Sequence, residues 1–204
     1  MVGLWVYSPL PQSNTLVPET NAQPRNPGQS FNGNAPGPPH TDLKLGTWNV
    51  QTLYKPGAFD NLINEARRFN LDVVAIQETR WTGTGTVDKE GYKFIYGGPE
   101  EHALGTGFLI KQTVENSIKD VKFINNRLSY LKLKGKFKTI YLINTHAPTE
   151  DKDPDIKDEF YETLDQTLDT LTSYSMKILL GDMNAKLGHE QMYKPALGDH
   201  SLHD

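Results

Sequence analysis

The stretch Lys177-Ile-Leu-Leu-Gly-Asp-Met-Asn-Ala-Lys-Leu-Gly188 decides how this chain folds, because an apolar segment runs directly into a polar turn. The apolar segment is typical of a buried strand. It contains Met176, Ile178, Leu179 and Leu180. We therefore expect a core strand that ends at Gly181, where a glycine lets the backbone turn and lets another group approach closely.

A carboxylate and a carboxamide follow this strand at Asp182 and Asn184. Residues two apart on an extended chain point the same way, so we expect these two side chains to stand side by side at the end of the strand. The same tetrapeptide also occurs as an ordinary turn. Whether it belongs to a functional site depends on the partners that the rest of the chain supplies.

Length and composition set the limits for these partners. The chain has 204 residues, enough for one domain with a substantial core. Its net charge of -4 gives no overall basic field for nucleic acid, so any DNA contact must come from local patches. It has no cysteine, which excludes disulfides and thiolate metal sites. The opening residues predict neither a signal peptide nor a membrane span, so we expect a protein that is not secreted.

Residues 1–40 differ from the rest of the chain in composition. They hold eight of the thirteen prolines and only two charged side chains, Glu19 and Arg25. Such a segment buries too little apolar surface to offset its ordering entropy, so we expect a disordered tail. The folded domain is then expected to cover residues 41–204.

The first part of that domain reads as a strand, a helix and a strand. Alternating apolar residues predict a strand at 43–50, and a second buried strand is expected at 72–78. Between them Pro56-Gly57 opens a helix with an apolar face, formed by Phe59, Leu62, Ile63, Ala66 and Phe69. This order indicates an α/β unit whose two strand ends lie at one rim.

Short strands and one long helix complete the pattern. After a Gly/Thr-rich loop at 82–86, turn signals separate strands expected at 92–96, 107–111, 118–123, 128–134 and 139–144, as in an antiparallel meander. A long helix is expected from Ile156, with its apolar stripe at Ile156, Phe160, Leu164, Leu168 and Leu171. Lysines at every second position of 132–138 indicate a solvated sheet face or, alternatively, contacts to a phosphate backbone.

Several of the expected strands end in polar residues that suit one reaction. They are Asn49, Glu78, His146, Asp182 and Asn184. Phosphodiester hydrolysis needs a carboxylate to hold a hard cation, a role that suits Glu78. A second carboxylate, Asp182, would orient and deprotonate water, held by an amide of Asn49 or Asn184, and His146 could donate to the phosphorane. We expect the Glu78 and Asp182 oxygens to lie roughly 4–8 Å apart.

Five short motifs occur in an order that resembles the endonuclease/exonuclease/phosphatase superfamily. They are Thr47-Trp-Asn-Val50, Ala75-Ile-Gln-Glu-Thr79, Gly105-Thr-Gly-Phe108, Thr145-His-Ala-Pro148 and Leu180-Gly-Asp-Met-Asn-Ala185. Members include abasic-site endonucleases, inositol polyphosphate phosphatases and the endonuclease domains of non-LTR retrotransposons, and the likeness is strongest to the last group. The resemblance covers about residues 43–204.

The resemblance implies both a fold and an activity. The fold is a four-layer α/β sandwich of two mainly antiparallel sheets flanked by helices. The activity is cleavage of DNA phosphodiester bonds with Mg²⁺ or Mn²⁺, in a retrotransposon-derived protein of the nucleus or cytoplasm. By position, Glu78 resembles the metal ligand, Asp182 and Asn184 the pair that orients the water, and Asn49 the amide that supports them.

The chain departs from the family pattern in three places. Gln51 stands where many members have an aspartate, which weakens a second metal contact, and His146 stands where relatives often have a tyrosine. Relatives also finish at a Ser-Asp-His motif after further strands, whereas this chain stops at Asp204. His200 and His203 follow no strand signal and are not expected to replace that histidine. We therefore expect a fold incomplete at its C-terminus, weak Mg²⁺ binding and impaired cleavage.

Two other functions remain compatible with the sequence. One is a catalytically silent module that binds nucleic acid or another partner, which Gln51 and the absent C-terminal motif favour. The other is a phosphomonoesterase, which is weaker because residues 185–188 lack the aromatic and basic side chains that those enzymes carry after this motif.

Removal of residues 1–40 tests the predicted tail. We expect the thermal transition of residues 41–204 to match that of the full chain within about one or two degrees, because a segment without a core contributes little stability. Differential scanning calorimetry of both chains measures this. A loss of folded yield would mean that Trp5 or Tyr7 docks on the domain.

Overall fold

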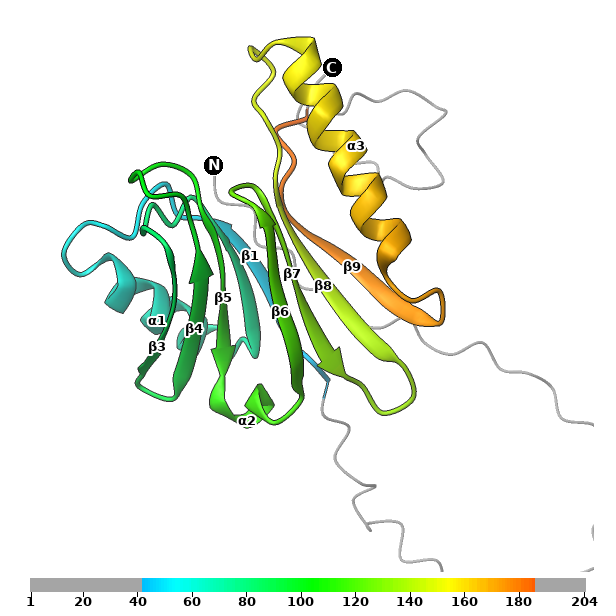
Figure 1. Cartoon of the computed structure of the whole chain (residues 1–204). Coiled ribbons are helices and arrows are strands. Elements are labelled where there is room, and N and C mark those ends of the chain that lie inside the picture. The colour runs from blue at the N-terminus through cyan, green and yellow to red at the C-terminus, as the bar shows by residue number, and fades with distance from the viewer. Residues whose placement is uncertain (1–41, 186–204) are drawn as a thin grey trace, which may run out of the picture.

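The computed structural model describes residues 42–185, and these form two β-sheets packed between helices (Figure 1). The tail predicted at residues 1–40 lies outside the described residues, as do His200 and His203. Within residues 42–185, no helix is both long and apolar enough to cross a membrane.

The first sheet has five strands in the order β1-β2-β5-β4-β3. Their bounds are β1 Leu45–Asn49, β2 Val73–Gln77, β3 Thr84–Lys89, β4 Tyr92–Gly97 and β5 Thr106–Lys111. β1 and β2 are parallel, joined by helix α1 at Ala58–Arg68, and the other pairs are antiparallel. The strand, helix and strand predicted from the sequence are therefore confirmed.

The second sheet has four strands in the order β6-β7-β8-β9. Their bounds are β6 Ile118–Asn125, β7 Leu128–Lys134, β8 Thr139–His146 and β9 Ser175–Asp182. The pairs are antiparallel except β8 and β9, which are parallel because helix α3 crosses between them. The helices are α1 Ala58–Arg68, the short α2 Gln112–Glu115 and α3 Pro154–Thr170.

Three apolar clusters hold the four layers together. One lies between α1 and the outer face of the first sheet and includes Ile63, Ile76 and Phe94. A second fills the space between the two sheets, and a third packs Phe160 and Leu164 of α3 onto the second sheet. Figure 1 shows the resulting order of α1, first sheet, second sheet and α3. The predicted four-layer sandwich of two mainly antiparallel sheets is confirmed.

The strand predicted as a buried core strand, β9, is the last strand of its sheet within residues 42–185. β9 has a neighbour on one side only among the described residues, and Met176 and Leu179 are 49% and 42% exposed. Ile156, expected in the stripe of α3, is also exposed, because it lies in the first turn of a helix that begins at Pro154. Apolar periodicity alone does not show which strand ends a sheet.

Strand β3 begins at Thr84, so residues 84–86 of the loop predicted at 82–86 belong to a strand. The sequence did not predict this strand, because β3 is an exposed edge strand that lacks the alternation of apolar residues seen in a half-buried strand. Its pairing with β4 decides its structure. That pairing places Gly85 opposite Tyr96, and a Cβ atom at Gly85 would lie 2.5 Å from the tyrosine hydroxyl.

A buried polar network joins the two sheets. Gln77 of β2 donates from Nε2 to Asn144 Oδ1 of β8 at 2.7 Å and to Thr47 Oγ1 of β1 at 3.1 Å. Asn144 donates from Nδ2 to the carbonyls of Ile76 and Gly107 at 2.9 and 3.0 Å. Buried polar groups that are fully bonded select one arrangement of a core, because any shift of one sheet leaves them unpaired.

Asn144→Ala should destabilise the fold strongly. It leaves one buried Gln77 donor without a partner, at a cost of about 1–3 kcal/mol, and removes the side-chain donor to the Ile76 and Gly107 carbonyls, which face each other in the β2–β5 ladder. We expect a loss of at least about 2 kcal/mol in the free energy of unfolding by urea titration. Asn61→Ala, on the exposed face of α1, is the matched control and should change little. Equal stability of both variants would contradict this role of the network.

Candidate active site

The polar strand ends meet at one rim of the sandwich. Parallel pairing places the ends of β1 and β2 together, with Asn49 opposite Gln77, and the ends of β8 and β9 together, with His146 opposite Asp182. The two sheets pack face to face, so β1 lies against β9. Residues more than 130 positions apart therefore reach a common site.

The amide of Asn49 connects the two carboxylates across the sheets. Its Nδ2 donates to Glu78 Oε1 at 3.0 Å and to Asp182 Oδ2 at 3.0 Å. Because one nitrogen contacts both, these oxygens are at most about 6 Å apart. Asn49 Oδ1 in turn accepts from the backbone N–H of Gln51 at 3.0 Å, which fixes the orientation of the amide.

Glu78 is surrounded by donors and held by an unusual backbone. Its φ of 55° lies in the left-handed region, which costs free energy in a non-glycine residue and turns the side chain toward the site. Oε1 accepts from Asn49 and lies 3.4 Å from His146 Nε2. Oε2 accepts from Arg80 Nη2 at 3.1 Å, and the Arg80 side chain is 45% exposed. Arg80 is thus the partner of Glu78 that lies toward solvent.

Asp182 is held by its own turn. Gly181 has a φ of 146°, and a Cβ atom there would lie 1.9 Å from the carbonyl oxygen of Thr145, so only glycine allows β9 to approach β8 this closely. Asp182 Oδ1 accepts from the backbone N–H of Asn184 at 3.0 Å.

The predicted side-by-side placement of Asp182 and Asn184 on an extended strand is wrong. β9 ends at Asp182, and Asn184 has a φ of 45°. The Asn184 side chain turns away and donates to the Ala147 carbonyl at 2.7 Å. Asn184 therefore supports Asp182 through its backbone N–H, and its amide anchors the turn to the end of β8.

His146 lies beneath Glu78 instead of facing outward. Its side chain is 5% exposed, which leaves no room for the direct donation to a phosphate that the sequence suggested. Arg127 Nη1 lies 3.5 Å from Nδ1 and donates to the His146 carbonyl at 3.1 Å. Because a guanidinium only donates, we assign the imidazole proton to Nε2, which faces Glu78. Burial first, and the nearby Arg127 charge second, lower the pKa of His146, so the ring is neutral at pH 7.

Sequence reasoning missed the two arginines of the site. Arg80 follows Glu78 by two residues, and a left-handed φ of 53° brings its side chain back to that carboxylate. Arg127 lies in the turn before β7 and contacts His146 of the adjacent strand. The spacing of Arg80 from Glu78 was a usable signal. No local pattern indicated Arg127, because its contact depends on strand pairing.

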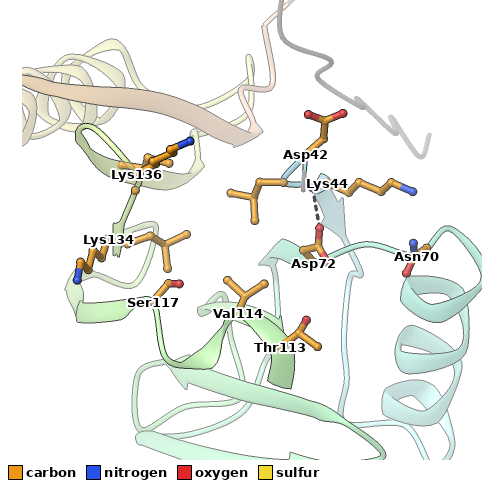
Figure 2. A pocket seen from close by; sticks show the side chains of 13 residues that line it. Asp42, Lys44, Asn70, Asp72, Thr113, Val114, Ser117, Lys134 and Lys136 are labelled. Carbon is orange, nitrogen blue, oxygen red and sulfur yellow. Dashed lines mark hydrogen bonds between the residues drawn. The ribbon is translucent and has the colours of Figure 1, made fainter. Parts of the chain in front are cut away.

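A cavity of about 640 Å³ lies at the opposite end of the sandwich, near the starts of β1 and β2 (Figure 2). Asp72 there accepts from the backbone N–H of Lys44 at 2.9 Å, a structural bond that ties the two strand starts. Lys134 and Lys136 line the same cavity. These members of the lysine alternation are therefore remote from the polar strand ends, which agrees with a solvated face.

The chain belongs to the Endonuclease/Exonuclease/phosphatase family, whose model matches residues 46–202. Among curated proteins, craniofacial development protein 2 of Tragulus javanicus is 30% identical over 149 residues. That match covers 72% of this chain and 26% of the relative, so the chain spans about a quarter of that protein's length.

Solved structures of other proteins share the fold. An AP endonuclease from Leishmania major superposes with a TM-score of 0.55 at 18% identity, covering 71% of this chain and 56% of the other. D. rerio TDP2, crystallised with a single strand DNA product, gives a TM-score of 0.52 at 16% identity, covering 70% and 61%. At these identities the likeness establishes the fold alone.

His146 should make the stability of the metal-free protein depend on pH. Because its pKa is lowered in the folded state, the unfolded chain binds a proton more readily, and stability falls as pH drops below the ordinary value of about 6.5. His146→Gln keeps a donor nitrogen but does not titrate. In EDTA, we expect the difference in thermal midpoint between wild type and variant to change from pH 7.5 to 5.5, with wild type losing more. A constant difference would contradict the neutral buried imidazole.

Proposed function

We propose that this chain is a divalent-metal-dependent endonuclease that hydrolyses phosphodiester bonds in DNA. The observation that carries the proposal is the Asn49 amide, which holds the carboxylates of Glu78 and Asp182 within about 6 Å of each other at the junction of the two sheets. Membership in a family of nucleases and phosphatases supports this reading. The DNA product bound to TDP2 supports DNA as the substrate, and nuclear residence would follow from that substrate.

The donor set fits a hard cation. Relatives in this family generally depend on a divalent metal. The carboxylate of Glu78 provides oxygen ligands of the kind that Mg²⁺ prefers, and Mn²⁺ accepts the same ligands. Within residues 42–185 no three His, Cys, Asp or Glu side chains converge on a common metal position, so water would have to complete the coordination. Glu78 Oε2 would hold the ion after Arg80 moves away, and His146 Nε2 carries a proton and does not ligate.

Different residues of the site would carry out different parts of the hydrolysis. The bound cation would neutralise charge on the phosphate oxygens. Asp182 accepts the proton of the attacking water, since each of its oxygens has a lone pair left after bonding Asn49 and the Asn184 N–H. Asn49 and His146 position Glu78 through their contacts to its Oε1. Arg80, once released from Glu78, would donate to a phosphate oxygen.

Gln51 limits the strength of metal binding. It is exposed, and its backbone N–H donates to Asn49 Oδ1 at 3.0 Å. Its side chain is a neutral amide where many relatives have an aspartate. We therefore expect weak affinity for Mg²⁺ and slow cleavage, because the ion would be held by the Glu78 carboxylate without a second carboxylate at position 51.

A nicking assay on supercoiled plasmid tests the proposal. We expect slow relaxation in Mg²⁺ that EDTA stops. Asp182→Asn and Glu78→Gln should each lower the rate by about 10²–10⁴, as is usual for groups of these kinds. Asp165→Asn removes an exposed carboxylate from α3 and is the matched control, which should retain the wild-type rate.

Other outcomes would assign another function. Cleavage that survives both EDTA and Asp182→Asn would refute the proposed site. DNA binding without any cleavage in Mg²⁺ or Mn²⁺ would identify a silent binding module. Release of phosphate from soluble inositol phosphates would identify a phosphomonoesterase.

A further inference from the structure

Two aromatic rings from different loops meet beside the candidate site. Tyr54 lies in the loop that follows β1, and His102 lies in the loop between β4 and β5. Their ring centroids are 4.4 Å apart with an angle of 47° between the planes. Both loops leave the sandwich at the rim where Asn49 and Glu78 lie, as Figure 1 shows for the ends of β1 and β4.

Both loops are tied to the backbone that directly follows Glu78. Leu53 is buried and donates its N–H to the Thr79 carbonyl at 3.0 Å, which positions Tyr54. Arg80 donates its N–H to the Leu104 carbonyl at 2.9 Å, and its own carbonyl accepts from His102 Nδ1 at 3.0 Å. The Arg80 side chain contacts Glu78. Arg80 therefore bonds both His102 and the Glu78 carboxylate, and Tyr54 joins this chain of contacts through His102.

Packing of the domain does not explain the position of Tyr54. Its side chain is 66% exposed, and it is absent from the three apolar clusters. An exposed tyrosine whose ring is held by a neighbouring ring offers a flat surface that is already ordered, so a ligand that stacks on it loses little additional entropy. Lys55, which follows it, is also exposed and adds a positive charge at this rim.

We propose that Tyr54 and His102 form a stacking site for an unpaired DNA base that flanks the scissile phosphodiester. This inference rests on the proposed function, because it needs a phosphodiester at Glu78 and Asp182. A base stacks on an aromatic ring regardless of its identity, since every base has a π-face. The site therefore selects DNA whose bases are unpaired near the cut, without reading their sequence.

A pair of oligonucleotides with the same backbone isolates the base contact. We propose to compare dT12 with a twelve-residue oligomer that carries abasic tetrahydrofuran units, by fluorescence anisotropy in EDTA so that no cleavage occurs. Wild type should bind dT12 about tenfold more tightly, as expected for stacking of one base. Tyr54→Ala should lose this preference, Tyr54→Phe should keep it, and His102→Ala should reduce it because the tyrosine ring loses its support.

Tyr174→Ala is the matched control. Tyr174 is 73% exposed and lies just before β9, at the end of the sandwich opposite the candidate site. Its removal should leave the preference for dT12 unchanged. An equal effect of Tyr174→Ala would show general binding to surface aromatics and would overturn the stacking site.

The outcomes also separate this inference from the proposed function. The stacking site is overturned if Tyr54→Ala keeps the wild-type preference for dT12 over the abasic oligomer, or if wild type has no such preference. Neither outcome changes the result of the nicking assay. A protein that fails to nick plasmid but shows the Tyr54-dependent preference refutes the endonuclease and leaves Tyr54 and His102 as a base-binding site without a scissile phosphodiester beside it. Tighter binding to rU12 than to dT12 would assign the site to RNA and contradict DNA as its ligand.

Discussion

The buried hydrogen bond from Gln77 Nε2 to Asn144 Oδ1 connects the centres of the two sheets and, with the bonds from Asn144 to the Ile76 and Gly107 carbonyls, sets how they lie on each other. Apolar side chains alone would let the sheets slide, since their contacts are not directional. Gln77 and Asn144 do not permit this, because any shift would leave donors and acceptors unpaired in a region that water does not reach. The position of the candidate site follows from this constraint.

The residues of the site lie within two positions of Gln77 or Asn144 in the sequence, or on strands that pair with the strands of these two residues. Glu78 follows Gln77 directly, and His146 lies two residues after Asn144. Parallel pairing of β9 with β8 brings Asp182 opposite His146. Asn49, from the strand paired with β2, then bonds Glu78 and Asp182 with one amide. The structural network and the candidate site are thus continuous, so substitutions in the network should disturb the site geometry as well as stability.

The segment from Glu78 to Arg80 has a second function in this arrangement. Left-handed backbone at both residues turns their side chains toward each other, which places an arginine beside the proposed metal ligand. The same segment binds the loops that carry Tyr54 and His102. In our proposals, a cation, a phosphate and a flanking base are therefore all positioned by one short, strained connection between β2 and the rim.

The sequence by itself determined the order of the elements other than β3 and α2, and the polar residues at the ends of four strands. Apolar periodicity and Gly-Asp-x-Asn were enough for this, because both are local patterns that depend on residues close along the chain. It did not determine that Met176 and Leu179 are exposed, that Asn184 acts through its backbone, or that Arg127 holds His146. These features depend on which strands pair and which strand ends a sheet. Only the tertiary structure decided them. Some of the contacts join residues that are distant in the chain, and others need backbone angles that local propensity disfavours.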